Sequence, residues 1–224
     1  MLVACGYNIF ISGGTSSGKT TFLNALAESI PKEERVIVIE DSMELKLDYI
    51  ENIVHMECRN ANSRGQGRIN MAQLIKSSLR MRPNRIIVGE VRGEEVMEML
   101  QAMNTGHSGS MSTGHGNSVE GMLKRLESMY LMALPLSIDA IRSQIAEGID
   151  IMIHLEKQIS GKRQVVEISE LSDYADGRFI LNTLFRMNGE GKLERLGESK
   201  LNHTRKVLLK GGNYADRLQK TGII

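Results

Sequence analysis

Near the start of the sequence, a glycine-rich segment has the residue types and spacing that bind phosphate groups. It reads GGTSSGKT from Gly13 to Thr20 and follows the apolar run NIFIS. Glycines allow successive backbone N–H groups to turn inward around an anion, which side chains would obstruct. Apolar residues at helical spacing follow from Lys19, and the amino end of a helix attracts negative charge. The pattern therefore predicts a P-loop between a strand and a helix, which binds a nucleoside triphosphate.

Single residues of this loop have separate expected tasks. We expect Lys19 to reach the terminal phosphates of ATP and the Thr20 hydroxyl to ligate Mg²⁺, so ATP and Mg²⁺ are the predicted cofactors. The predicted nucleotide-binding residues are Gly13, Gly14, Thr15, Ser16, Ser17, Gly18, Lys19, Thr20 and Thr21.

Carboxylates follow two of the other apolar runs. Hydrolysis needs a group that orients and deprotonates water. Glu90 directly follows the run RIIVG, which places it at the carboxyl edge of a sheet, where ligands bind in open α/β sheets. Glu40, Asp41 and Glu44 end the run RVIVIE in the same way, and such a cluster implies a metal ion or its water shell. For Glu40 alone, a solvated acidic turn is the preferred interpretation.

Two of the five histidines, His107 and His115, lie in the Gly/Ser/Thr-rich stretch Thr105–Asn117. A single histidine is usually a structural residue of the surface or core. His115 follows the short predicted strand Ser110–Thr113, so we expect it near the terminal phosphate or the catalytic water.

Strands and helices alternate up to Gly148, which predicts an α/β fold with a mainly parallel sheet flanked by helices. The expected strands are Asn8–Ser12, Arg35–Glu40, Val54–Glu57, Arg85–Gly89 and Ser110–Thr113, and the expected helices are Lys19–Glu28, Met71–Arg80, Glu94–Thr105, Asn117 to about Met132, and Leu136–Gly148. Asn70 is expected to cap a helix, and Asn117 with Glu120 resembles a capping box. The polar segment Asn60–Arg68 is expected to be a mobile loop.

The pattern changes after Gly148. Two β-hairpins are predicted, formed by Ile149–Glu156 with Val165–Leu171 and by Phe179–Met187 with Leu193–Leu196. The tail from Asn202 to Leu218 is expected to be helical, with an interruption at Gly211–Gly212. We therefore expect residues 1–148 to form the ATPase core. Residues 149–224 are expected to be the C-terminal part of the same domain, a small appendage of hairpins and a terminal helix.

The composition argues against several classes of protein. The 28 Lys and Arg residues nearly balance the 27 Asp and Glu residues, so nucleic acid is not the expected partner. No apolar run approaches the roughly 18 residues of a membrane span. The two cysteines, Cys5 and Cys58, fit a reduced cytosolic setting. We expect a cytoplasmic protein that meets the membrane only through partners.

Together these segments resemble the ATPases of the type II/IV secretion superfamily, and most closely its CpaF-like branch, which powers Tad/Flp-type pili. Four motifs occur in the family's order: Walker A at Gly13–Thr21, the Asp box IEDSMEL at Ile39–Leu45, Walker B within Leu79–Gly93, and the His box at Thr105–Asn117. The resemblance implies a RecA-like P-loop NTPase fold and hydrolysis of Mg-ATP.

The resemblance also implies roles for single residues. Glu90 corresponds to the Walker B acid that acts on magnesium through water, Glu44 to the general base, and His115 to the His-box residue near the γ-phosphate. Arg59 and Arg80 resemble arginines that neutralise phosphate charge within or between subunits. A solvated salt bridge is the alternative for each arginine.

Proteins of this family work as hexameric rings on inner-membrane platform proteins, and each RecA-like domain closes against a preceding N-terminal domain. This sequence starts just before the Walker A strand, so that domain is expected to be absent. Family members commonly have bulkier residues around the His-box histidine. Gly114 and Gly116 are therefore expected to loosen the backbone around His115.

The predicted function is a motor ATPase that powers pilus assembly or protein secretion. Two alternatives stay open. The basic tail Lys200–Lys220 would also suit a DNA-handling ATPase of the conjugation or recombinase type. A nucleotide-binding module without turnover would have the same phosphate loop.

Overall fold

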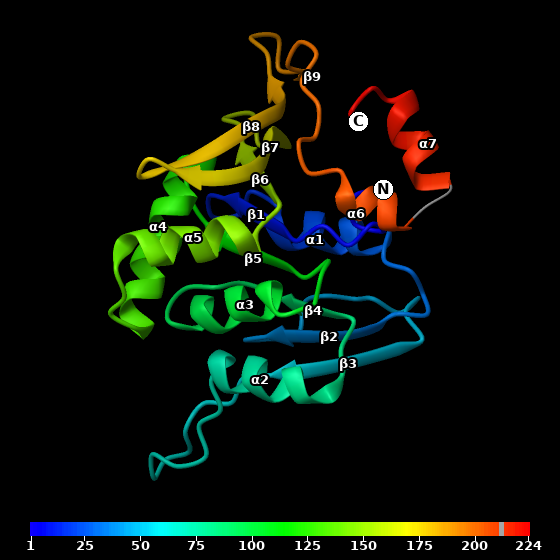
Figure 1. The fold of residues 1–224 in the computed structure, drawn as a ribbon. Coiled ribbons are helices and arrows are strands. Elements are labelled where there is room, and N and C mark those ends of the chain that lie inside the picture. Colours follow the sequence, from blue (N-terminus) through cyan, green and yellow to red (C-terminus); the bar gives the residue numbers. More distant parts are fainter. Residues whose placement is uncertain (211–212) are drawn as a thin grey trace.

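The computed structural model describes residues 1–210 and 213–224, and its centre is a nine-stranded sheet (Figure 1). The strand order is β3-β2-β4-β5-β1-β6-β7-β8-β9. The strands are β1 Ile9–Gly13, β2 Arg35–Glu40, β3 Asn52–Glu57, β4 Arg85–Val88, β5 Met111–His115, β6 Ile151–Lys157, β7 Arg163–Ala175, β8 Arg178–Met187 and β9 Leu193–Arg195. From β3 to β6 the neighbours pair in parallel, and from β6 to β9 they are antiparallel. The predicted, mainly parallel sheet is confirmed.

Helices cover both faces of this sheet. They are α1 Lys19–Ala27, α2 Met71–Ser78, α3 Glu95–Asn104, α4 Val119–Ala133, α5 Ile138–Gly148, α6 Arg205–Lys210 and α7 Asn213–Lys220, with a 3₁₀ turn at Leu79–Met81. Helices α2 to α5 pack on one face against Ile37 and Ile39, whereas α1 and the C-terminal tail pack on the other against Val36 and Val38. Strand β2 is apolar almost throughout because both of its faces are buried. Within residues 1–210 and 213–224, no helix has the length and apolar character needed to cross a bilayer.

Side-chain caps fix where two helices begin. At α2, the Asn70 side chain accepts the N–H of Gln73 and the Gln73 side chain accepts the N–H of Asn70, which confirms the predicted cap. The capping box predicted at Asn117 is wrong by one residue. The chain is extended at Ser118, and its hydroxyl accepts the N–H of Gly121 at 2.9 Å, which is the geometry of a helix N-cap.

The predicted hairpins extend the central sheet. Strand β6 lies beside β1 in parallel, and the register pairs Gly13 with Leu155. Strand β7 then returns antiparallel to β6 after a turn in which Gly161 has a φ of 85°. The strand that carries the phosphate loop is therefore paired with residues that follow position 148.

The C-terminal tail lies beside the first residues of the chain, as Figure 1 shows for α6 and the N-terminus. The Tyr7 hydroxyl donates to the His203 carbonyl oxygen at 2.6 Å. The Glu170 carboxylate accepts the backbone N–H groups of Asn202 and His203, each at 2.8 Å. The predicted interruption at Gly211–Gly212 lies outside the described residues.

Candidate active site

The loop between β1 and α1 has a backbone shape that depends on its glycines. Ser16 and Gly18 have positive φ angles of 58° and 92°. A Cβ atom on Gly13 would lie 2.5 Å from the Ser17 hydroxyl oxygen and 2.6 Å from the Leu155 carbonyl oxygen, whereas a Cβ on Gly14 would meet no atom within 4 Å. The loop can therefore close tightly against β6 only with glycine at position 13.

Replacing Gly13 by alanine is expected to lower the free energy of unfolding by about 1–3 kcal/mol, because the added methyl group must displace Ser17 or β6. Gly14→Ala is the matched control, since that position is open, and we expect it to change stability by less than about 0.5 kcal/mol. Urea denaturation followed by circular dichroism measures both. Equal stability of the two variants would contradict the tight packing at Gly13.

Lys19 is the first residue of α1, and its side chain reaches back to the start of the loop. Its ammonium donates to the carbonyl oxygens of Gly13 and Gly14, each at 3.1 Å, and lies 3.3 Å from His115 Nδ1. The residue is 8% exposed. Burial lowers the pKa of Lys19, and the nearby carboxylate of Glu90 partly opposes this shift. A buried ammonium in this position is available to an anionic group entering the loop.

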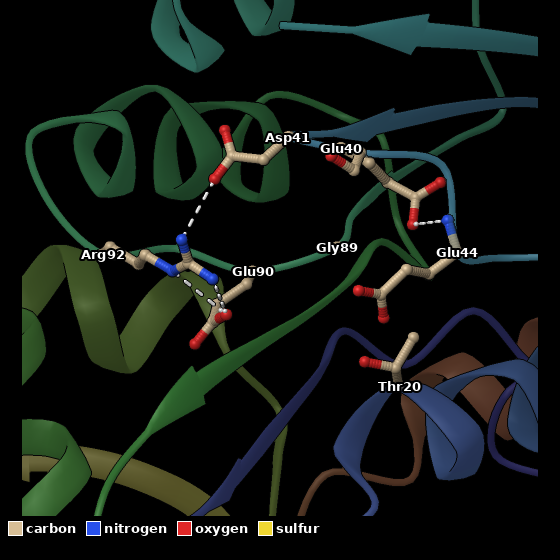
Figure 2. A pocket seen from close by; sticks show the side chains of 8 residues that line it. Thr20, Glu40, Asp41, Glu44, Gly89, Glu90 and Arg92 are labelled. Carbon is tan, nitrogen blue, oxygen red and sulfur yellow. Dashed lines mark hydrogen bonds and ion pairs between the residues drawn. The ribbon is translucent and has the colours of Figure 1, made fainter. Parts of the chain in front are cut away.

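Glu90, directly after Gly89, lies between a histidine and an arginine. Its Oε1 atom is 2.8 Å from His115 Nε2, but the two are not aligned as a hydrogen bond. Its Oε2 atom accepts hydrogen bonds from Arg92 Nε at 3.1 Å and Nη2 at 2.7 Å, and Arg92 also contacts Asp41 at 3.3 Å (Figure 2). The hydrogen bond to Glu90 is the main cause of the raised pKa of Arg92. Arg92 thus fixes the position of the Glu90 carboxylate, and the Oε1 atom is buried without a hydrogen-bond partner.

Glu40 is buried, and the preferred interpretation of it as a solvated acidic turn is wrong. Its Oε1 atom accepts the backbone N–H groups of Glu44 and Leu45, each at 3.1 Å, while its Oε2 atom is buried without a partner. Burial raises the pKa of Glu40, and these two hydrogen bonds act in the opposite direction. The side chain is buried because β2 is an inner strand and Gly89 packs against its Cγ atom. Glu40 therefore holds the loop that carries Glu44.

A cavity of about 230 Å³ lies between this loop and α1 (Figure 2). Its lining residues are Thr20, Glu40, Asp41, Ser42, Glu44, Gly89, Glu90 and Arg92. Figure 2 shows the Glu44 side chain pointing toward Thr20. Oxygen donors of this kind suit Mg²⁺, and the unpartnered oxygen of Glu40 belongs to the same set.

The carboxylates around this cavity are not arranged as direct metal ligands. Among residues 1–210 and 213–224, no group of three or more His, Cys, Asp or Glu side chains is placed to hold a metal ion. A magnesium ion in this cavity would therefore need ligands beyond these carboxylates, such as the Thr20 hydroxyl and phosphate oxygens.

A second cavity of about 390 Å³ adjoins the phosphate loop. It is lined by Thr15, Ser16, Ser17, Gly18, Lys19, Thr20, Thr21, Glu44, Glu90, Thr113, His115 and Arg163. The structure thus brings together most of the predicted site residues from four separate segments. Arg163, the first residue of β7, was not predicted. The predicted hairpin β6–β7 carries it here because β6 pairs with β1, and no local motif marks that pairing.

The glycines on either side of His115 serve packing. A Cβ atom on Gly114 would lie 2.9 Å from Met122 Cε and 3.0 Å from Phe10 Cζ, and a Cβ on Gly116 would lie 3.0 Å from Met122 Cβ. Both glycines therefore let α4 approach the end of β5 closely, a different role from the loosening expected from the sequence.

Arg59 and Arg80 lie apart from both cavities. Arg59 follows the edge strand β3, is exposed, and donates from Nε to the Gly67 carbonyl oxygen at 2.7 Å. Arg80 is exposed in the 3₁₀ turn that leads to the amino end of β4, whereas the phosphate loop follows the carboxyl end of β1. Neither arginine lines a cavity beside the loop of its own chain, so a role between subunits stays a prediction.

Comparison with known proteins agrees with this geometry. Residues 1–185 match the family model described as type II/IV secretion system protein. A putative conjugal transfer protein of Mycobacterium tuberculosis is 37% identical over 177 residues, which are 79% of this chain and 49% of the relative.

Two solved structures have the same fold. The VirB11 ATPase of the Brucella suis type IV secretion system, in complex with sulphate, is 32% identical with a TM-score of 0.68 over 75% of this chain and 51% of that chain. The pilus retraction motor PilT with bound ADP shares the fold at 20% identity and a TM-score of 0.58, over 98% of this chain and 55% of that chain. The fold is that of RecA-like secretion ATPases. The chain spans about half the length of the curated relatives that it matches.

Proposed function

Because the chain belongs to the type II/IV secretion system protein family, a family of secretion ATPases, we propose that it is a Mg-ATP-hydrolysing motor domain that powers pilus assembly or protein secretion. One observation carries the proposal. Lys19, Thr20, Glu44, Glu90 and His115 all line one cavity beside the glycine-rich loop. This set combines phosphate binding with candidates for activating water.

The geometry supports the following division of tasks. Lys19 and the loop N–H groups bind the terminal phosphates, and Thr20 binds magnesium. When bound, the magnesium ion neutralises the charge that develops on the phosphate oxygens. Glu44 accepts the proton of the attacking water. Glu90, held by Arg92 and adjacent to His115, orients the water shell of the metal, and His115 contacts the γ-phosphate.

We infer that the working form is a hexameric ring at the cytoplasmic face of the inner membrane, bound to platform proteins, and that the chain belongs to the CpaF-like branch. The positions of Arg59 and Arg80 support an assembly of this kind. Both are exposed and lie away from the loop of their own chain, so they are available to the site of a neighbour.

If the site is completed between subunits, the ATPase rate per mole of chain should rise steeply with protein concentration. Arg59→Ala should lower the rate at high concentration by about 10³-fold or more, the usual size of an arginine contribution to phosphoryl transfer. Mixing Arg59→Ala with Lys19→Ala should restore part of the activity, because the second variant supplies an intact Arg59 to the intact loop of the first. Arg64→Ala, exposed in the same loop, is the control. A rate per mole that does not change with concentration, without complementation, would contradict a shared site.

The likeness to a conjugal transfer protein favours a DNA-handling ATPase as the second candidate. Two cations of the basic tail already form ion pairs within the chain, Lys206 with Asp150 and Lys210 with Glu34. These ion pairs weaken the case for a DNA-handling ATPase. Salt-dependent DNA binding that stimulates hydrolysis would support it. ATP binding by a folded sample without hydrolysis would identify a nucleotide-binding module instead.

A further inference from the structure

A buried histidine outside the four sequence motifs, His154, lies beside the start of the phosphate loop. It belongs to β6, and the parallel register of β6 with β1 pairs it with Ser12, the residue before Gly13. His154 is 3% exposed, and Ser12 is fully buried. Polar groups buried in this way have hydrogen-bond partners in most proteins, so the neighbours of the ring show what it connects.

One side of the ring contacts the strand that leads into the loop. The Nδ1 atom of His154 lies 2.8 Å from the Ser12 hydroxyl oxygen, which is within hydrogen-bonding distance. The Nε2 atom lies 3.7 Å from Oε1 of Glu156, a carboxylate that is more than half exposed. The carboxylate beside Nε2 favours the proton on that nitrogen, which leaves Nδ1 to accept the hydrogen of the Ser12 hydroxyl.

The ring is neutral near pH 7. Burial lowers the pKa of His154, whereas the carboxylates of Glu156 and Glu167 and a hydrogen bond with the Asn117 backbone oppose this shift. A neutral imidazole has one N–H donor and one acceptor nitrogen. It can therefore join two different partners.

The second partner belongs to the segment that carries His115. Asn117 lies two residues after His115, and its backbone is the group with which His154 forms a hydrogen bond. His154, Gly116 and Asn117 also line one pocket of about 300 Å³, together with the loop residues Gly14, Thr15 and Ser17. His154 thus contacts both the strand before the phosphate loop and the segment after His115.

The relative position of these two segments matters for the proposed chemistry. Gly13 pairs with His115 on one side of β1 and with Leu155 on the other, and Lys19 Nζ lies 3.3 Å from His115 Nδ1. The γ-phosphate would therefore lie between a group of the loop and a group of β5. A displacement of about 1 Å in such an arrangement can cost about 100-fold in rate.

We propose that His154 is a positioning residue for ATP hydrolysis, which fixes the His115 segment relative to the phosphate loop by contacting Ser12 and the Asn117 backbone. This inference rests on the proposed ATPase function. His154 acts through His115 and does not itself contact the nucleotide.

The test separates hydrolysis from binding of the diphosphate. His154→Leu removes both polar contacts and leaves an apolar side chain in the buried site. At saturating Mg-ATP, its kcat should fall by about 10–100-fold. The Kd for Mg-ADP, measured by titration calorimetry, should change by less than about two-fold, because ADP lacks the phosphate that His115 would contact.

Ser12→Ala tests the same contact from its other end and removes only a hydroxyl group. It should also lower kcat, and the double variant should be no slower than His154→Leu, because the two residues act as one unit. Should His154→Leu fail to fold, as judged by circular dichroism, Ser12→Ala decides alone. Ser169→Ala is the matched control, since Ser169 is equally buried in a strand but contacts Glu167 and Thr183.

The possible results distinguish this inference from the function on which it rests. Unchanged kcat in the folded variants, or an equal loss of Mg-ADP affinity and kcat, would overturn the positioning role and leave the proposed function intact. Losses that multiply in the double variant would exclude a role through the contact with Ser12. Failure of the unaltered chain to hydrolyse Mg-ATP would overturn the proposed function and this inference with it.

Discussion

Replacing Lys19 by alanine should abolish ATP binding at concentrations that saturate the unaltered chain. The ammonium of Lys19 is buried inside the loop and donates to carbonyl oxygens at 3.1 Å. It would therefore donate directly to a phosphate oxygen, without an intervening water molecule. Hydrogen bonds to charged groups contribute about 1.5–3 kcal/mol each. Losing two of them raises Kd by at least about 100-fold. Titration calorimetry with Mg-ATP measures the change.

Lys32→Ala removes the same charge at an exposed position just after α1 and is the matched control. Circular dichroism establishes that both variants are folded. ATP affinity of Lys19→Ala equal to that of Lys32→Ala would exclude the loop as the phosphate site, and the proposed function would fail with it.

Glu90→Gln should lower kcat by about 10²–10³-fold, the usual cost of removing one preorganised electrostatic group, and leave the Kd for Mg-ATP within about three-fold, less than 1 kcal/mol. The amide keeps the size of the side chain but removes the negative charge that Arg92 and His115 hold in place. Under the proposed function, nucleotide binding depends mainly on the loop, whereas orientation of the metal-bound water depends on the carboxylate. Steady-state ATPase rates and calorimetric binding separate the two effects.

Glu94→Gln is the control for this change, because Glu94 is exposed four residues further along, at the start of α3. Glu44→Gln should give the same pattern as Glu90→Gln. Hydrolysis by Glu90→Gln at the rate of the Glu94→Gln control would show that Glu90 has no part in the chemistry.

Much of the fold was predictable because its signals are local. The run RVIVIE forms β2 with the predicted bounds, since a strand buried on both faces must be apolar throughout. The Asn70 cap was equally readable, because the capping residue and its partner Gln73 are three positions apart. Gly18 of the phosphate loop marks a positive φ angle that other residues adopt only with strain.

Features that depend on contacts between distant segments were not predictable. The burial of Glu40 follows from the strand order and from Gly89, about fifty residues away along the chain. Arg163 reaches the loop only because β6, the first strand of the predicted hairpin, pairs with β1. The packing role of Gly114 depends on Met122 and Phe10. None of these contacts leaves a periodic or spacing signal in the sequence.

The pairing of Gly13 with Leu155 has a mechanical consequence. The strand that leads into the phosphate loop and the strand β6 are adjacent in one hydrogen-bonded sheet, so a displacement of the loop would be passed directly to β6 and to the hairpin that it forms with β7. In a motor domain, this pairing would couple the phosphate site to the C-terminal strands of the sheet.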